Sequence, residues 1–415
     1  MKTSLRIFLS GILFLSILQA KIIHVPADQP SIQAGINNAV NGDTVLVAQG
    51  TFVENLDFKG KNIVVGSLFL ITGDTSYISQ TVIDGNNYST VVTFKSRENN
   101  SALLTGFSVT HGKGKDQAPT GAWPYDYIGG GITCRDSSNP RLVGLRIFEN
   151  TAPYGAGVCI RQANPVLENV IILQNTSSHT GGGIYCYYYS SPILKNVIIQ
   201  KNTSVFWGGG VACLLNSSST FQNCFIAENI SNEGGGIYCF EQSNASLENT
   251  TITKNIAYER GGGFYGDQGS MICDRSRRSN IYLNYSAIGS DVCTNTALTV
   301  IVDTFTVVAH SSDFAYPMKA FVFDILHGKI TQVSHDLYVD PSGSDDNSGQ
   351  SSLDPLHSIS FALTKIMADS LMPHTIHIAN GTYKPSSGDH FPLSVKSYVS
   401  LSGESVSKTI LDAER

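Results

Sequence analysis

Short apolar runs that alternate with polar residues, separated by glycine and asparagine, recur along the middle of the chain. A glycine-rich triplet followed by a run such as Ile-Tyr-Cys returns every 26 or 27 residues, and a second motif, Leu-x-Asn-x-x-Ile-x-x-Asn, interleaves with it. The triplets begin at Gly129, Gly155, Gly181, Gly208, Gly234 and Gly261. The runs in both motifs have a period of two and no helical spacing, so each repeat is predicted to contain two short strands.

A repeat of this length and type predicts one coil of a right-handed parallel β-helix. The unit is too short for a propeller blade and lacks the helix of leucine-rich, ankyrin or tetratricopeptide repeats. In a β-helix, like positions of successive coils stack ~4.8 Å apart, and a coil folds only against its neighbours. We therefore predict an all-β solenoid built from coils of about 26 residues.

Stacking also predicts which side chains face the interior. The residue after each triplet and the one two positions later are expected inside, with an outward residue between them. The inner residues are then Ile132, Val158, Ile184, Val211, Ile237 and Phe264, followed by Cys134, Ile160, Cys186, Cys213, Cys239 and Gly266. The outward residues are Thr133, Cys159, Tyr185, Ala212, Tyr238 and Tyr265. The stacked cysteines are interpreted as small apolar core residues without disulfides, because the Cβ vectors of stacked neighbours run parallel.

Two columns of asparagine are predicted at corners of the coil, because asparagine tolerates the left-handed backbone and its amide can hydrogen-bond along a stack. One column contains Asn169, Asn196, Asn223 and Asn249, and the other contains Asn150, Asn175, Asn202, Asn229 and Asn255. The Asn-x-Ser/Thr sequences at Asn175, Asn202, Asn229 and Asn249 are interpreted as parts of these columns and not as glycan acceptors.

One outward column between these corners carries apolar residues at three of its five positions. It contains Arg146, Ile171, Ile198, Phe225 and Thr251. An exposed apolar strip would mark a contact surface. The alternative, which we favour, is that a loop covers the strip or that the register shifts by one residue.

The first twenty residues have the pattern of a secretory signal peptide. Lys2 and Arg6 precede a short apolar run from Ile7 to Leu18, and Ala20 ends the segment. An N-terminal membrane anchor is the alternative. The mature chain is therefore expected to be exported, either secreted or held at a surface, without a transmembrane helix.

Charge and composition exclude several classes of function. A net charge of −6, with only 14% charged residues and no basic block, gives no electrostatic footprint for nucleic acid. Eight cysteines are too sparse for a disulfide scaffold, and no paired Cys or His spacing proposes a zinc site. We expect no cofactor and no metal. Asp340, Asp345 and Asp346 are a weak calcium candidate for which a solvated turn is the alternative.

The repeats resemble those of polymorphic outer-membrane proteins and of other pectin-lyase-like β-helix proteins of bacteria. The preceding segment, from IHVPADQPSIQAGINNAV to TVIDG at 81–85, resembles the N-terminal cap of such proteins, in which a short helix (here about 31–40) plugs the apolar core. The resemblance implies a location outside the cell or at a bacterial cell surface, associated with the outer membrane. The fold is strongly implied, but the activity is not, because this fold hosts lyases, hydrolases, esterases, adhesins and binding modules.

The cap recurs near the C-terminus. HTIHIANGTY at 374–383 parallels DTVLVAQGTF at 43–52, and the segment resembles the opening of a bacterial β-helix family of unknown function. The expected organisation is a signal peptide at 1–20, a cap with the first coils at 21–100, repeats at 101–283, an off-period β segment at 284–335, and the start of a second β-helix at 336–415. Because this second cap has no coils to cover, we expect a fragment of a longer protein, a monomeric module within it.

An insertion is the sharpest candidate for a binding site. The motif residues Leu104 and Leu142 are 38 residues apart instead of about 26, and the excess lies near 113–127. Aromatic rings stack on sugar faces and carboxylates accept hydrogen bonds from hydroxyls, so this composition suits carbohydrate. The candidate ligand-binding residues are Trp123, Tyr125, Tyr127, Asp116, Asp126 and, on a later coil, Trp207, with Tyr187, Tyr188 and Tyr189 as an extension. The alternative is that these aromatics only hold a long loop against the solenoid.

No catalytic residues are assigned. Outward acids are scattered, since Lys195 and Gln222 separate Glu168 from Glu248, and no acid, base and nucleophile converge. The leading hypothesis is an exported, non-catalytic module that binds a polysaccharide or surface glycan or acts in adhesion. The alternatives are a polysaccharide lyase or glycoside hydrolase, with its site unrecognised or beyond residue 415, and a solenoid that acts only as a stalk.

Overall fold

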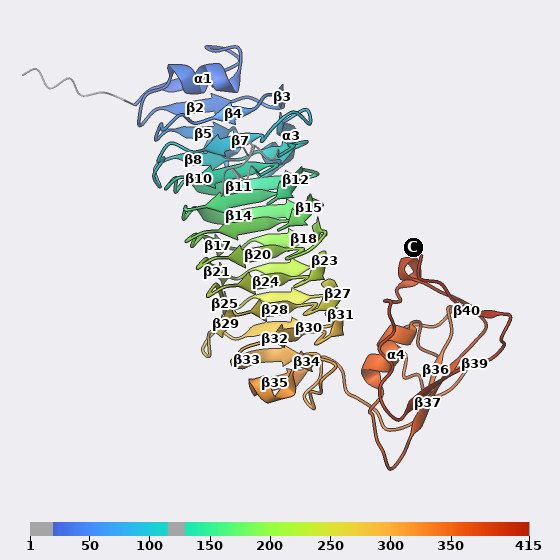
Figure 1. Cartoon of the computed structure of the whole chain (residues 1–415). Helices are drawn as coiled ribbons and strands as arrows, with labels where there is room; N and C mark the ends of the chain where they lie inside the picture. Colours follow the sequence, from blue (N-terminus) through green and yellow to red (C-terminus); the bar gives the residue numbers. More distant parts are fainter. Residues whose placement is uncertain (1–19, 115–128, 415) are drawn as a thin grey trace, which may run out of the picture.

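The computed structural model describes residues 20–114 and 129–414 as a right-handed parallel β-solenoid with a few short helices. Figure 1 shows its coils stacked along one axis, from the helix α1 (Ile32–Asn38) at one end to the strand β35 (Phe321–Gly328) at the other. The predicted fold class is confirmed.

Three parallel sheets, here called A, B and C, form the wall of the solenoid. Sheet A comprises β1 (Ile22–Val25), β2 (Thr44–Val47), β3 (Gly50–Val53), β5 (Val64–Ser67), β6 (Thr81–Asp84), β8 (Leu103–Thr105), β9 (Ser108–Thr110), β11 (Arg141–Phe148), β14 (Val166–Leu173), β17 (Ile193–Lys195), β18 (Ile198–Gln200), β21 (Ser218–Gln222), β22 (Phe225–Ala227), β25 (Asn244–Glu248), β26 (Thr251–Thr253), β29 (Ser270–Cys273), β30 (Ser279–Tyr282), β33 (Leu298–Phe305) and β35. Sheet B comprises β4 (Leu56–Asp57), β7 (Val92–Phe94), β10 (Ile132–Arg135), β13 (Val158–Arg161), β16 (Ile184–Tyr187), β20 (Val211–Leu214), β24 (Ile237–Phe240), β28 (Phe264–Asp267), β32 (Val292–Thr294) and β34 (Ala315–Tyr316). Sheet C comprises β12 (Thr151–Tyr154), β15 (Thr176–Thr180), β19 (Thr203–Ser204), β23 (Ile230–Glu233), β27 (Ile256–Arg260) and β31 (Tyr285–Ile288).

The predicted inner residues stack in register and are buried. In sheet B, Ile184 pairs with Val211 and Cys186 with Cys213, and all four side chains are fully buried in the main core. All eight cysteines are free thiols, and burial raises the pKa of Cys186 well above its usual value. The stacked cysteines therefore act as apolar core residues, as predicted.

The predicted outward column of sheet B differs from expectation in one respect. Its residues do lie outside the main core, but most of them are buried in a second apolar cluster on the outer face of the sheet. Tyr238, for example, is only 1% exposed, because Trp207 and Phe240 pack over its ring. A period of two indicates the side of the sheet, but not what covers that side.

The glycine triplets form a tight corner between sheets C and B. Gly181 has a φ of +70°, in the left-handed region that favours glycine. A Cβ atom on Gly182 would lie 2.5 Å from the carbonyl oxygens of both Thr203 and Gly209 on the next coil. The first position therefore requires a left-handed backbone, and the second requires space for the neighbouring coil.

Both asparagine columns form as predicted. In the buried column, the backbone N–H and the Nδ2 of Asn175 both donate to Oδ1 of Asn202, at 3.0 and 2.9 Å, and the pattern repeats from coil to coil. The last amide, Asn284, donates in the same way to the buried Asp291 carboxylate. Complete burial of Asn175, Asn202 and Asn229 agrees with their structural interpretation.

The described part of the chain contains four α-helices, and two of them occupy corresponding places in two cap-like segments. The first segment contains β1, α1, β2, β3, β5 and β6 in that order, with β4, α2 and α3 as additional elements between them. The second runs β36 (Leu337–Val339), α4 (Ile359–Lys365), β37 (His374–Ile378), β38 (Gly381–Tyr383), β39 (Val399–Gly403), β40 (Thr409–Leu411). Ser31 and Ser358 cap the two helices through side-chain oxygens. The C-terminal elements, drawn in red in Figure 1, surround an apolar core of their own.

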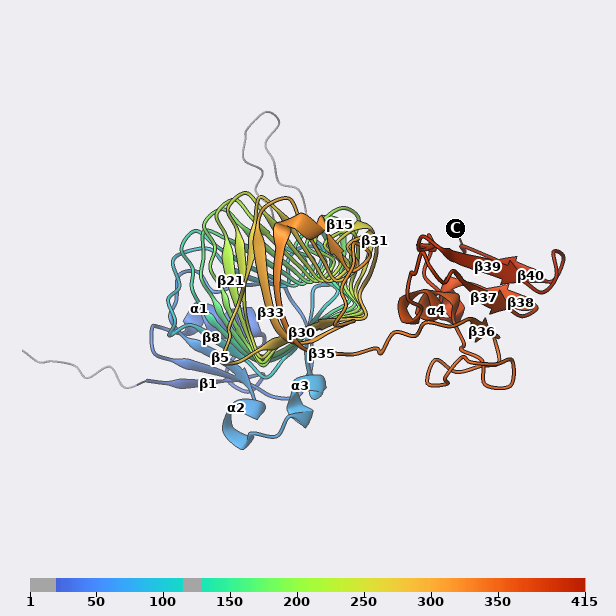
Figure 2. The same cartoon turned by 90° about the horizontal axis from the view of Figure 1, so that it is seen from below.

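The remaining helices lie outside the ring of strands. α2 (Phe69–Thr72) and α3 (Ser76–Gln80) follow β5, and Figure 2 shows them on the outside of the solenoid. Short 3-10 turns occur at Met318–Ala320 and Pro385–Ser387. Within the described residues, none of the helices has the length and apolar character needed to cross a membrane.

Candidate functional site

The residue directly before each glycine triplet lies at the corner where sheet C meets sheet B. These residues pair from coil to coil, as the bridges of Trp207 to Thr180 and to Glu233 show. The set, here called the corner column, contains Tyr154, Thr180, Trp207, Glu233, Arg260 and Ile288. It packs against the second apolar cluster and therefore faces away from the main core.

Aromatic rings form the floor of this corner. The Trp207 ring stacks on Tyr238 with a centroid distance of 5.5 Å and an interplanar angle of 5°. Tyr265 meets Tyr238 edge to face at 5.5 Å, and Phe240 extends the stack. Such offset and edge-to-face contacts hold the rings in fixed orientations.

Polar groups lie on this floor at the end formed by the later coils. The Glu233 carboxylate lies 3.6 Å from the Arg260 guanidinium, which also donates to the Tyr265 hydroxyl at 3.3 Å. Burial raises the pKa of Glu233, and the charge of Arg260 opposes this shift. The Tyr238 hydroxyl donates to Asp267 at 3.3 Å. The corner thus offers carboxylates, a guanidinium and hydroxyls beside apolar ring surface.

Solvent-exposed rings border the corner column. Phe206 is 43% and Tyr258 is 55% exposed, both on the sheet C side. Tyr188 and Tyr189, which are 41% and 60% exposed, lie in the turn after β16, at the other end of that strand from the corner. The His179 ring lies between Phe206 and Tyr154, with centroid distances of 4.8 and 4.7 Å. Exposed rings beside fixed hydrogen-bonding groups are the features that a stacking ligand such as a sugar requires.

The structure places only part of the predicted site. Trp207 lies at the corner, whereas Trp123, Tyr125, Tyr127, Asp116 and Asp126 lie outside the described residues. The described residues that flank them, Gly114 and Gly129, are at this same corner. The Gly114 N–H donates to the carbonyl of Thr151 in β12, and Gly129 opens the first triplet.

Sequence reasoning missed Glu233, Arg260, Phe206 and His179. The corner column was visible in the sequence as the residue before each triplet, but its mixed chemistry, from Thr to Trp to Arg, hides the periodicity. The pairing of Glu233 with Arg260 follows from their equal positions in successive repeats.

Sheet A presents a different, flatter outer face. The register of the predicted apolar strip is confirmed, with Ile171 beside Ile198 and Ile198 beside Phe225. These three side chains are 36–38% exposed. The favoured alternative, a covering loop or a shifted register, was therefore wrong for the described residues.

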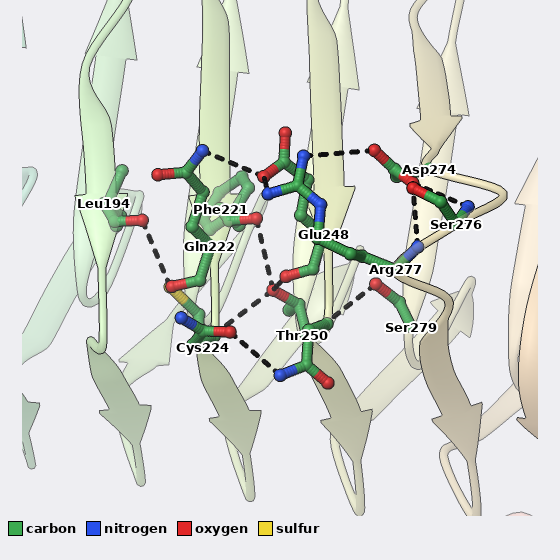
Figure 3. A network of polar contacts seen from close by, with 12 residues as sticks. Leu194, Phe221, Gln222, Cys224, Glu248, Thr250, Asp274, Ser276, Arg277 and Ser279 are labelled. Carbon is green, nitrogen blue, oxygen red and sulfur yellow. Dashed lines mark hydrogen bonds and ion pairs between the residues drawn. The ribbon is translucent and has the colours of Figure 1, made fainter.

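A polar network runs beside this strip. Gln222 donates to Glu248 at 2.8 Å, and Glu248 pairs with Arg277 at 2.7 Å, which in turn contacts Asp274 (Figure 3). These charged side chains form ion pairs with one another along the sheet, so the face presents no cluster of like charges to a ligand. We therefore regard the corner, and not this face, as the candidate site.

The structure shows no constellation for metal binding. Among residues 20–114 and 129–414, no group of three or more His, Cys, Asp or Glu side chains is arranged to hold a metal ion. The Asp345 carboxylate accepts hydrogen bonds from the backbone N–H groups of His357 and Ser358, and Asp340 accepts from Ser342. Asp340 and Asp345 thus bind backbone N–H groups of neighbouring turns through their carboxylates.

Comparison with known proteins finds two family matches. Residues 130–296 match the model of a right-handed beta helix region, and residues 341–413 match that of a protein family of unknown function, DUF1565. No curated protein and no solved structure matches the chain. The matched ranges coincide with the repeats and with the C-terminal cap-like segment.

Proposed function

We propose that this chain is an exported, non-catalytic β-helix module that binds a polysaccharide or surface glycan along the corner between sheets B and C. The single observation that carries the proposal is the pair of exposed rings, Phe206 and Tyr258, on the sheet C side of the corner beside the Glu233–Arg260 pair. Coils repeat along the axis at the strand spacing, so an extended glycan chain would meet side chains of the corner on several successive coils.

The proposal also covers the location of the protein and its relationship to known protein families. The pattern of residues 1–20 supports export, and the repeats support a kinship with pectin-lyase-like and polymorphic outer-membrane proteins. The module would then act at the cell surface or outside the cell, in glycan binding or adhesion. Fold alone does not distinguish these roles from enzymatic ones.

A matched pair of variants tests the binding face. Phe206→Ala removes a ring that is 43% exposed at the corner, and Phe225→Ala removes one that is 37% exposed on sheet A. On a glycan array probed with the full chain, we expect Phe206→Ala to weaken binding by about tenfold, because a stacking ring is lost. Phe225→Ala should bind like the parent. Equal losses in both variants, or no glycan binding by the parent, would contradict the proposal.

One observation favours the enzymatic alternative. Glu233 is buried enough for its pKa to be raised, and Asp267 is close enough to contribute to this shift. A carboxyl group with a raised pKa near a second carboxylate is a feature of the acid and its partner in glycoside hydrolases. Release of new reducing ends or unsaturated oligosaccharides from a panel of polysaccharides, abolished in Glu233→Gln, would replace the binding proposal with a catalytic one.

A further inference from the structure

The C-terminal segment carries a separate pocket on the outer face of its sheet. Tyr338 in β36 pairs in register with His377 in β37, which pairs with Ser402 in β39. These three outward residues line a cavity of about 380 Å³, whose walls include Asp340, Ser352 and Glu404. This volume lies within the range of small-molecule sites.

An aromatic platform forms the base of the pocket. The rings of Tyr338 and His377 stack with a centroid distance of 4.8 Å and an interplanar angle of 22°. Asp336 fixes the His377 ring from one side, with Oδ2 3.1 Å from Nε2, while its other oxygen accepts the Thr375 N–H. The platform is therefore held in place, yet His377 keeps 40% of its side chain exposed.

Carboxylates with unused acceptor capacity surround the platform. Asp340 accepts two hydrogen bonds from Ser342 on Oδ1 only, and Glu404 accepts the Asn380 N–H on Oε2 only. Within the described residues, the second oxygen of each has no hydrogen bond. These two carboxylates make the pocket acidic and unfavourable for an anionic ligand.

The N-terminal cap-like segment serves as an internal control. The register equivalents of Tyr338, His377 and Ser402 are His24, Leu46 and Gly66. There the side chain of Leu70 in α2 lies over Gly66, so close that an added Cβ would come within 2.9 Å of it, and Leu46 is buried. The same backbone is thus sealed by apolar packing in one copy and lined with an aromatic platform and acceptors in the other.

We infer that this pocket binds one uncharged or amino-substituted sugar ring, stacked on Tyr338 and His377 with its hydroxyls donating to Asp340 and Glu404. A flat ring surface and paired hydroxyl donors match the platform and its acceptors, whereas a uronate or a phosphate would face the carboxylates of Asp340 and Glu404. This site is distinct from the corner between sheets B and C and does not depend on glycan binding there.

Calorimetric titration of the full chain tests this inference with three probes: cellotetraose, the amino-sugar tetramer from chitosan, and tetragalacturonate. We expect saturable binding of at least one of the first two and none of tetragalacturonate. Tyr338→Ala should weaken that binding by about tenfold, and His24→Ala, the equivalent exposed position of the other copy, should leave it unchanged.

Glu404→Gln provides a second variant at an exposed position that leaves the platform intact, and a melting curve confirms folding of each variant. Phe206→Ala separates the two sites, because it should affect the corner only. The inference is overturned if neither neutral nor amino probe binds, if tetragalacturonate binds equally well, or if folded Tyr338→Ala and Glu404→Gln both bind like the parent.

Discussion

The two cap-like segments share one order of elements but differ in how their last strands are covered. In the N-terminal copy, Ile83 in β6 is fully buried, because β9 pairs with β6 and the next coil covers it. Its register equivalent in the C-terminal copy, Leu411 in β40, is 49% exposed, and β40 pairs only with β38 in the described residues. The difference shows that an inner position of a solenoid is buried by its neighbouring coil, not by its own.

The strongest test of this comparison truncates the equivalent residue of each copy to alanine. Ile83→Ala should lower the free energy of unfolding by about 3 kcal/mol, because it leaves a cavity in a fully buried site. Leu411→Ala should cost less than about 1 kcal/mol at a half-exposed site. Urea denaturation of the two variants measures both values. Similar losses would show that β40 is covered in solution and that the comparison fails.

A second test examines the end of the buried asparagine column. There Asn284 has no further asparagine to contact and donates to Asp291 instead. Burial raises the pKa of Asp291 to about 7 from 3.8, so the folded state holds this proton more tightly than the unfolded state. The contribution of this group to stability is therefore full below about pH 4 and falls as the pH rises toward 7. Asp291→Asn keeps the acceptor for Asn284 and removes the titration.

We expect Asp291→Asn to melt higher than the parent at pH 8, by the equivalent of about 1–3 kcal/mol, with the difference shrinking toward pH 4. Thermal melts at pH 4, 6 and 8 measure this difference. A difference that is constant over this range would show that Asp291 does not titrate between these values.

The smallest effect is expected outside the core. Arg277 pairs with Glu248 on the exposed face of sheet A, where Arg277 is 56% exposed and solvent screens the pair. Arg277→Ala should therefore change the free energy of unfolding by about 0.5 kcal/mol, less at high salt. Urea denaturation at low and high salt checks this value. A loss comparable to that of Ile83→Ala would mean that surface ladders, and not the stacked core, hold successive coils together.

Periodicity made most of the solenoid predictable. Each triplet and each Asn motif occupies the same place in successive coils, so inward residues such as Ile184 and Cys213, and both asparagine columns, followed from their positions alone. Features that do not repeat along the chain could not be predicted from the sequence. The burial of Tyr238 depends on rings from other sheets, and the cover that Leu70 provides comes from a helix that no repeat contains.

The candidate sites divide in the same way. Trp207 could be singled out by composition, whereas Glu233 and Arg260 meet only because two unlike residues share one repeat position. The pocket of the C-terminal segment needs Tyr338, His377 and Ser402 side by side, although they are far apart in the sequence and belong to no repeat. Only the pairing of the strands brings them together.

The buried asparagine column has a further consequence for how this chain can change. Successive members are separated by 25, 27, 27, 26 and 29 residues, yet each amide donates to the next at 2.9–3.0 Å. Residues added or removed in the turns thus leave the register untouched, because a one-residue slip would leave buried amides without partners in every coil. The solenoid can therefore acquire new surface loops, and with them new ligands, without redesign of its interior.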